Sequence, residues 1–147
     1  MKRTGFPFYI SKPDEYPAKL LFERLRNLNL PRGQYAVFGS GPLAIRGLLK
    51  RVGDLDVLVR DRAWNLVVPL GRIVRHGSDE TIDLDTGLTF GRSWAYGDFD
   101  IDRLIYEAEW IEGLPFVTLD AVVEFKQIAG RPQDLLHLRL LEAAGLI

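Results

Sequence analysis

Asp54 and Asp56 are the residues whose type and spacing most directly indicate chemistry in this sequence. They stand at the start of an apolar run, residues 55–59, that is typical of a buried strand. Side chains two apart on an extended chain project to the same side, and paired carboxylates repel each other unless a cation lies between them. The pair therefore predicts a site for Mg²⁺ or Mn²⁺. The structural alternative is a solvated turn that leads into a strand.

A bend at Gly39-Ser40-Gly41 precedes the acidic pair and interrupts a short apolar run, residues 34–38. Glycine allows backbone amides to approach an anion, and Ser40 adds a hydroxyl group. A helix starting just after the bend would add unpaired N–H groups and the positive end of its dipole. The bend is therefore expected to hold phosphate groups.

A third acid would complete a two-metal site. Asp83 and Asp85 alternate with Ile82 and Leu84, so the two acids are expected on one face of a strand. Asp83 is the predicted third metal ligand, with a further role in assisting deprotonation of an acceptor, and Asp85 is the second choice. An exposed strand face has the same alternating pattern and is the competing interpretation.

The order of these features resembles a known superfamily. A Gly39-Ser40 turn, thirteen further residues, Asp54 and Asp56 around one apolar residue, and a later apolar-Asp83-apolar strand are similar to the DNA polymerase beta-like nucleotidyltransferases. The nearest likeness is to the small prokaryotic members, including those of toxin–antitoxin pairs. The resemblance implies a nucleotidyltransferase fold in which the three acids bind metal and the Gly-Ser turn binds the nucleotide phosphates.

The resemblance extends to the C-terminal part of the chain. Lys126, followed by Arg131-x-x-Asp134, looks like the family's C-terminal helical segment, which makes Lys126 a candidate nucleotide-binding residue. A lone lysine on an amphipathic helix is more often simply solvated, and Arg131 and Asp134 are expected to cap the last helix. The sequence departs from the family pattern at Gly53, where serine is common, and at Gly41-Pro42, where polar or basic residues are more usual.

The implied activity is the transfer of a nucleoside monophosphate from a nucleoside triphosphate to an unidentified hydroxyl acceptor, on a protein, an RNA or a small molecule. The alternative is a catalytically weak or inactive binding module, such as a toxin–antitoxin component, whose interface with a partner protein carries the function. A metal-dependent glycosyltransferase is disfavoured because it leaves the Gly-Ser bend unexplained. The short C-terminal segment also suggests that a partner protein or a homo-oligomer completes the acceptor site.

The helices and strands predicted around these residues indicate an α+β fold, with a small mixed sheet, flanking helices and a helical C-terminal segment. We expect a single domain over residues 1–147, with a core at about 33–90 and the helical segment at about 99–147. Helices are predicted over residues 13–28, 43–51, 101–110, 118–128 and 132–145. Strands are predicted over residues 34–38, 55–59, 72–75 and 81–85, with a turn at 77–79 and an extended link at 114–117.

The composition of the chain limits the partners and the cellular compartment that are expected for this protein. The 147 residues are 47% hydrophobic and carry a formal net charge of -1, so no global field attracts nucleic acid or a membrane surface. Cysteine is absent, which excludes disulfides and thiolate metal sites and fits a cytoplasmic protein. The longest uncharged segment, residues 33–45, is too short to span a bilayer, so no membrane contact is expected. Neither His76 nor His137 has neighbours in the sequence that suggest a role.

Overall fold

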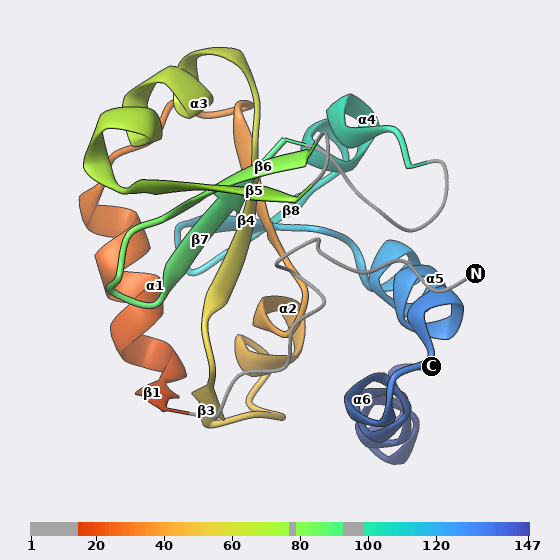
Figure 1. The fold of residues 1–147 in the computed structure, drawn as a ribbon. Helices are drawn as coiled ribbons and strands as arrows, with labels where there is room; N and C mark the ends of the chain where they lie inside the picture. The colour runs from red at the N-terminus through yellow and green to blue at the C-terminus, as the bar shows by residue number, and fades with distance from the viewer. Residues whose placement is uncertain (1–14, 77–78, 93–98) are drawn as a thin grey trace.

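A mixed β-sheet with helices on both faces organises the chain (Figure 1). The computed structural model describes residues 15–76, 79–92 and 99–147. Within these ranges seven strands form the sheet, in the order β5-β6-β7-β4-β2-β9-β8. The predicted α+β class is therefore confirmed, with a sheet wider than the sequence indicated. None of the helices in the described ranges is long and apolar enough to cross a membrane.

The strands of this sheet are short. They are β2 (Tyr35–Phe38), β4 (Leu55–Val59), β5 (Arg72–His76), β6 (Asp79–Asp83), β7 (Leu88–Gly91), β8 (Glu109–Ile111) and β9 (Leu114–Phe116). A separate pair joins β1 (Tyr16–Pro17) to β3 (Arg51–Val52). The helices are α1 (Ala18–Asn27), α2 (Gly41–Ala44), α3 (Asp61–Val67), α4 (Ile101–Tyr106), α5 (Leu119–Ala129) and α6 (Pro132–Ala143), with a 3₁₀ turn at Val68–Leu70.

The register at the centre of the sheet places four residues in one row. Strands β2 and β4 are antiparallel, with Phe38 opposite Asp56. Strand β7 runs parallel to β4, with Thr89 opposite Asp56, and β6 is antiparallel to β7, with Asp83 opposite Thr89. Directly paired residues of neighbouring strands project to the same face. Thr89 therefore lies between Asp56 and Asp83 on one face of the sheet.

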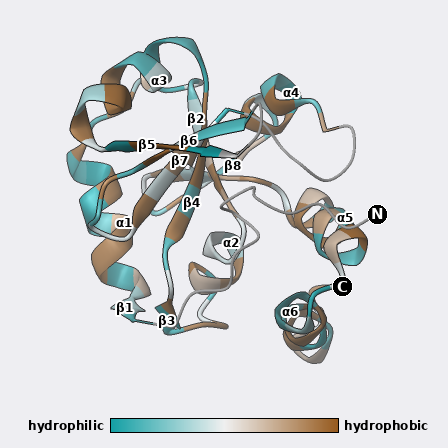
Figure 2. Cartoon of the chain, in the orientation of Figure 1, coloured by the Kyte–Doolittle hydropathy of each residue, from teal (hydrophilic) through white to brown (hydrophobic). Residues whose placement is uncertain are grey.

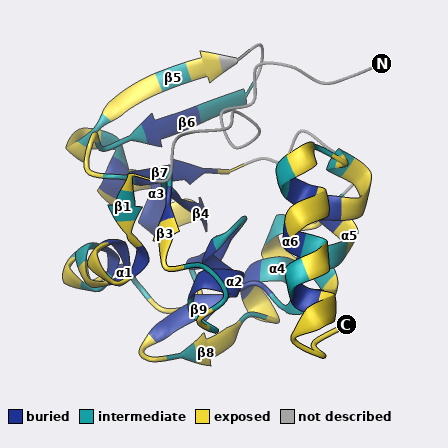
Figure 3. Cartoon of the chain, turned by 90° about the horizontal axis from the view of Figure 1, so that it is seen from below, coloured by how far each residue is buried: buried dark blue, intermediate teal, exposed yellow. Residues whose placement is uncertain are grey.

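Alternating side chains supply a separate apolar core to each face of the sheet. On one face the strand residues Val57 and Phe90 pack with buried residues of α1 and α3. On the other face Phe38 and Leu58 pack with buried residues of α4, α5 and α6, the last including Leu141. The central strands are largely apolar in Figure 2, and the outward sides of α5 and α6 are exposed in Figure 3. Asp56 is two residues from Leu58 in the same strand, so its side chain projects to the same face of the sheet, toward α5 and α6.

Two predicted helices are wrong in extent. The helix expected over residues 43–51 is only Gly41–Ala44, because the chain turns through Gly47 at φ +83° and then enters β3. The helix expected over residues 101–110 ends at Tyr106, and residues 109–111 form β8 instead. A turn at Glu112 and Gly113, both with positive φ, folds β8 back onto β9 as an antiparallel hairpin.

Other expected elements agree more closely with the structure. Strands β5 and β6 pair antiparallel, as the predicted hairpin requires, whereas Gly77 and Ser78 of its turn lie outside the described residues. Helix α1 begins at Ala18 rather than at residue 13; residues 13 and 14 are also outside the described ranges. The two C-terminal helices lie close to their predicted bounds, and Gly130, at φ +59°, ends α5 in the left-handed region typical of a helix C-cap.

Candidate functional site

The bend after β2 lies directly against the Asp56 carboxylate. Gly39 has φ +69°, which favours glycine, and a Cβ atom built on it would be 2.9 Å from Asp56 Oδ2. Asp56 is only 8% exposed and stands opposite Phe38, the last residue of β2. The bend and the acid predicted to bind metal are thus neighbours, because the antiparallel pairing of β2 and β4 brings the end of one strand beside the start of the other.

We expect Gly39→Ala to lower the free energy of unfolding by about 1–2 kcal/mol, since alanine strains the left-handed backbone, and to displace the Asp56 carboxylate. Gly33→Ala is the matched control, because Gly33 has φ +77° but nothing within 4 Å of the position that a methyl group would take. Chemical denaturation should give similar losses for both variants. Weaker Mg²⁺ binding is expected for the Gly39 variant alone. Equal Mg²⁺ affinity in the two variants would show that this contact is irrelevant to the site.

A small pocket joins the acidic residues of the sheet to the C-terminal helices. It has a volume of about 40 Å³. From the sheet side it is lined by Gly39, Ser40, Arg51, Gly53, Asp54 and Asp56, and from α5 and α6 and the loop between them by Phe125, Lys126, Arg131, Gln133 and His137. Two of the predicted metal ligands, the Gly-Ser bend and the predicted nucleotide-binding lysine therefore share one pocket.

The bend itself is less suited to hold phosphate than the sequence suggested. Helix α2 has only four residues, so it has little of the dipole expected from a longer helix. Gly41 is required for packing, since a Cβ atom there would lie 2.3 Å from Val37 Cγ1. Gly41 thus lets the chain pass close to β2, and a larger residue at this position would clash with Val37. The cationic side chains across the pocket are the stronger candidates to bind an anion.

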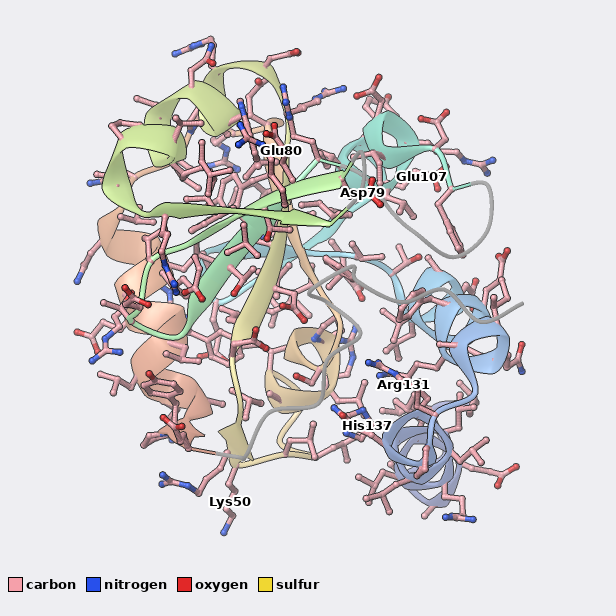
Figure 4. The ribbon with its side chains drawn as sticks, in the orientation of Figure 1. Lys50, Asp79, Glu80, Glu107, Arg131 and His137 are labelled. Atoms are coloured by element: carbon pink, nitrogen blue, oxygen red, sulfur yellow. The ribbon has the colours of Figure 1, made fainter. Side chains whose placement is uncertain are left out.

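Lys126 is buried, with 1% of its surface exposed, and is held by two side chains of α6. Its Nζ lies 2.9 Å from Nδ1 of His137 and 3.4 Å from Oδ1 of Asp134. Asp134 is fully buried and also accepts hydrogen bonds from Arg131, at 2.7 Å from Nε and 3.1 Å from Nη2. Figure 4 shows Arg131 and His137 on the side of α6 that faces α2. Lys126 is therefore part of a buried network and is not a solvated surface lysine.

The charge states in this network follow from burial and from the neighbouring charges. Burial alone would raise the pKa of Asp134, but hydrogen bonds and positive charge from Arg131 and Lys126 hold it below its ordinary value. Burial lowers the pKa of Lys126, and the Asp134 carboxylate opposes that shift. Burial and the positive charge of Lys126 lower the pKa of His137 from 6.5 to about 4. His137 is therefore a neutral imidazole near pH 7.

The expected cap of the last helix is confirmed. The backbone N–H of Arg131 donates to Oδ2 of Asp134 at 3.1 Å, which satisfies a donor at the start of α6. Asp134 thus has two roles that the sequence showed only in part: it caps α6 and it neutralises Lys126.

Asp83 and Asp85 do not join the acidic pair. Asp83 is two strands away from Asp56 in the sheet, and adjacent strands are about 4.8 Å apart. Its Oδ1 accepts the backbone N–H of Asp85 at 2.9 Å, and its Oδ2 is 3.6 Å from Nη2 of Arg72. Asp85 lies beyond the end of β6 and contacts Arg72 at 3.3 Å. In the described part of the chain, no three His, Cys, Asp or Glu residues are grouped to hold a metal ion.

Thr89 stands beside the acidic pair, where a third carboxylate on the next strand would be. It is 3% exposed, it is opposite Asp56, and its hydroxyl donates to Oδ2 of Asp54 at 3.3 Å. Thr89 was not predicted as a site residue, because an uncharged hydroxyl between apolar residues is not in itself typical of a metal site. Leu88 and Phe90, on either side of it, indicate only a strand.

The described site can therefore place two carboxylates, the Ser40 hydroxyl and the buried Lys126 ammonium around one small space. Three basic and two acidic side chains line it among the described residues, and the buried Asp134 beside Lys126 balances the third positive charge, so a bound divalent cation would make the site net positive. Such a site favours a ligand with several negative charges. Comparison of the chain with protein-family models, with curated proteins and with solved structures finds no match.

Proposed function

We propose that this protein is a divalent-cation-dependent nucleotidyltransferase that moves a nucleoside monophosphate from a nucleoside triphosphate to a hydroxyl acceptor. The observation that supports it most is that Asp54 and Asp56 line the same pocket as the Gly39-Ser40 bend and Lys126. These residues come from three separate parts of the sequence. A structural explanation of the acidic pair as a solvated turn does not account for the burial of Asp56.

The donor set fits one Mg²⁺ or Mn²⁺ ion better than two. Asp54 and Asp56 supply carboxylate oxygens, and the Thr89 hydroxyl orients Asp54 through its hydrogen bond. Magnesium sites in phosphate-transferring enzymes commonly use one or two carboxylates, with water and substrate phosphate oxygens completing the shell. When bound, the cation neutralises charge on the phosphates during in-line displacement.

The remaining side chains of the pocket are suited to hold the triphosphate. Lys126 and Arg131 provide positive charge from the helical side, and Arg51 provides it from the sheet side. A volume of about 40 Å³ accommodates a cation and a few oxygen atoms. The sugar and base of a nucleotide therefore lie outside this space. This arrangement favours binding through the phosphate groups.

In the proposed reaction the acceptor oxygen forms a bond to the α-phosphorus, and the bond from that phosphorus to the β-phosphate oxygen breaks. Pyrophosphate leaves with the pair of electrons from the broken bond, and the hydroxyl proton passes to solvent. The side chains of this protein act by positioning the phosphates and by stabilising charge. Asp83, expected to assist deprotonation, lies outside the pocket and has no step in this scheme.

The test is label transfer from each radiolabelled nucleoside triphosphate in the presence of Mg²⁺ or Mn²⁺, with cell lysate as the source of acceptor. We expect the wild-type protein to label a protein, an RNA or a small hydroxyl compound, and a chelator to stop the reaction. The Asp54→Asn/Asp56→Asn variant should transfer no label. Transfer that persists in this variant would contradict the assignment of the site.

A binding module of low or no activity is the second candidate, and the position of Thr89 favours it. If three carboxylates are necessary for catalysis, a threonine beside the pair leaves binding of a nucleotide or a partner protein as the function. Recovery of one protein by both the wild type and the double variant, without label transfer, would support this candidate. A cytoplasmic, toxin–antitoxin-type partner or a second copy of the chain fits either proposal.

A further inference from the structure

Among the described residues, the Lys126 ammonium has more donors than partners. An ammonium has three N–H groups, and in the described ranges two side chains, Asp134 and His137, lie within hydrogen-bond distance of Lys126 Nζ. Asp134 also accepts a hydrogen bond from Arg131. The distance from Lys126 Nζ to Asp134 is 3.4 Å, which is longer than the 2.9 Å from Nζ to His137. One N–H therefore remains for a ligand in the pocket, and the shorter of the two fixed contacts is with the imidazole.

We infer that His137 is a positioning residue: its Nδ1 accepts a hydrogen bond from Lys126 Nζ and orients the ammonium so that the remaining N–H reaches a phosphate oxygen of the ligand. This inference rests on the proposed function, because it requires a polyphosphate in the pocket beside Asp54 and Asp56. The imidazole is suited to the role because it is 4% exposed and therefore fixed by packing. A donor held in advance loses little conformational freedom on binding.

The chemistry of the contact specifies the tautomer of His137. An ammonium only donates, so Nδ1 must have its lone pair free and Nε2 must have the proton. A protonated imidazole beside Lys126 and Arg131 would add a third positive charge in a buried space, which is unfavourable. Lys126 requires the same neutral form of His137. If Nδ1 had a proton it could not accept a hydrogen bond, and the Lys126 ammonium would have only one partner in the described ranges.

The tautomer can be measured without any ligand. In the full-length protein with ¹⁵N-labelled histidine at pH 7, we expect the ring signals assigned to His137, by their disappearance in His137→Gln, to show a protonated Nε2 and an unprotonated Nδ1. A proton on Nδ1, or a doubly protonated ring, would overturn the inference whatever the protein binds.

The second measurement is calorimetric binding of inorganic pyrophosphate with Mg²⁺. Lys126→Met and His137→Leu should each weaken binding at least about tenfold, as expected for the loss or misdirection of a hydrogen bond between charged groups. His137→Gln, which retains an acceptor oxygen, should bind within about threefold of the wild type. Arg139→Leu, at an exposed position of α6, is the control for removing a polar side chain from this helix.

The outcomes separate this inference from the function on which it rests. Weak binding by His137→Leu with recovery in His137→Gln supports the positioning role. Wild-type affinity in His137→Leu, with a loss in Lys126→Met, overturns that role and leaves the proposed function standing. If the wild-type protein has the expected tautomer but does not bind Mg²⁺-pyrophosphate, the proposed function fails.

Discussion

Replacing Asp56 with asparagine is expected to lower the rate of metal-dependent transfer by about 10²–10³-fold, the range seen when one electrostatic contact to the reacting groups is removed. Asparagine retains the size of the side chain and one acceptor oxygen but loses the negative charge that would hold the proposed cation. Asp56 is the better of the two acids for this test, because it is buried against the Gly39 bend. Another side chain therefore cannot move into the place of its carboxylate. Transfer is measured as initial rates at saturating Mg²⁺.

Asp83→Asn is the matched control, because it makes the same chemical change one strand beyond Thr89. Asp83 contacts Arg72 and the backbone of Asp85 rather than the pocket, so we expect transfer within about threefold of the wild type. If the two variants lose equal activity, Asp83 acts in the reaction, which contradicts its position outside the pocket. If neither change affects an observed transfer, the reaction occurs elsewhere.

Asp134→Ala is expected to lower the free energy of unfolding by about 3–5 kcal/mol, because it leaves the buried ammonium of Lys126 without its counter-charge. It also removes the acceptor that caps α6. Domains of this kind are stable by only about 5–15 kcal/mol, so the variant would lose a large part of its stability. Urea denaturation followed by circular dichroism measures the loss.

The control for this change is the double variant Lys126→Met/Asp134→Leu, which removes both charges and replaces each side chain by an apolar one of similar length. Replacing a whole buried pair by apolar residues is often neutral or stabilising, so most of the lost stability should return. Recovery in the double variant would show that the unpaired charge, and not the lost cap alone, causes the damage. A cost below about 1 kcal/mol for Asp134→Ala would mean that Lys126 is not charged in the folded protein.

Local patterns in the sequence were sufficient to predict the parts of the site that are built from neighbouring residues. The Gly39 bend follows an apolar strand, Asp56 lies at the start of the next one, and the two meet because consecutive antiparallel strands pair. The cap formed by Arg131 and Asp134 is also local, since the residues are three apart at the start of a helix. Each of these features depends on chain geometry over a few residues.

The contacts that the sequence did not reveal depend on packing between distant elements. His137 is one polar residue in a leucine-rich helix, and only the packing of α6 on α5 brings it to Lys126. Strand β7 is four residues long and sits between β4 and β6, which separates Asp83 from the acidic pair. Alternation along the chain places Asp83 on the same face of the sheet as Asp56. It does not reveal that β7 lies between the two strands that carry these residues.

The acidic residues of the pocket come from β4 and the residue before it, whereas two of its three basic residues come from α5 and the start of α6. A metal–polyphosphate complex has charges of both signs, so its cation would be attached to one part of the chain and its phosphates to the other. The free energy of binding would then add to the cohesion between the two parts. Any substitution that loosens the packing of α6 on α5 would therefore weaken binding of the ligand, even if it changes no atom in contact with the ligand.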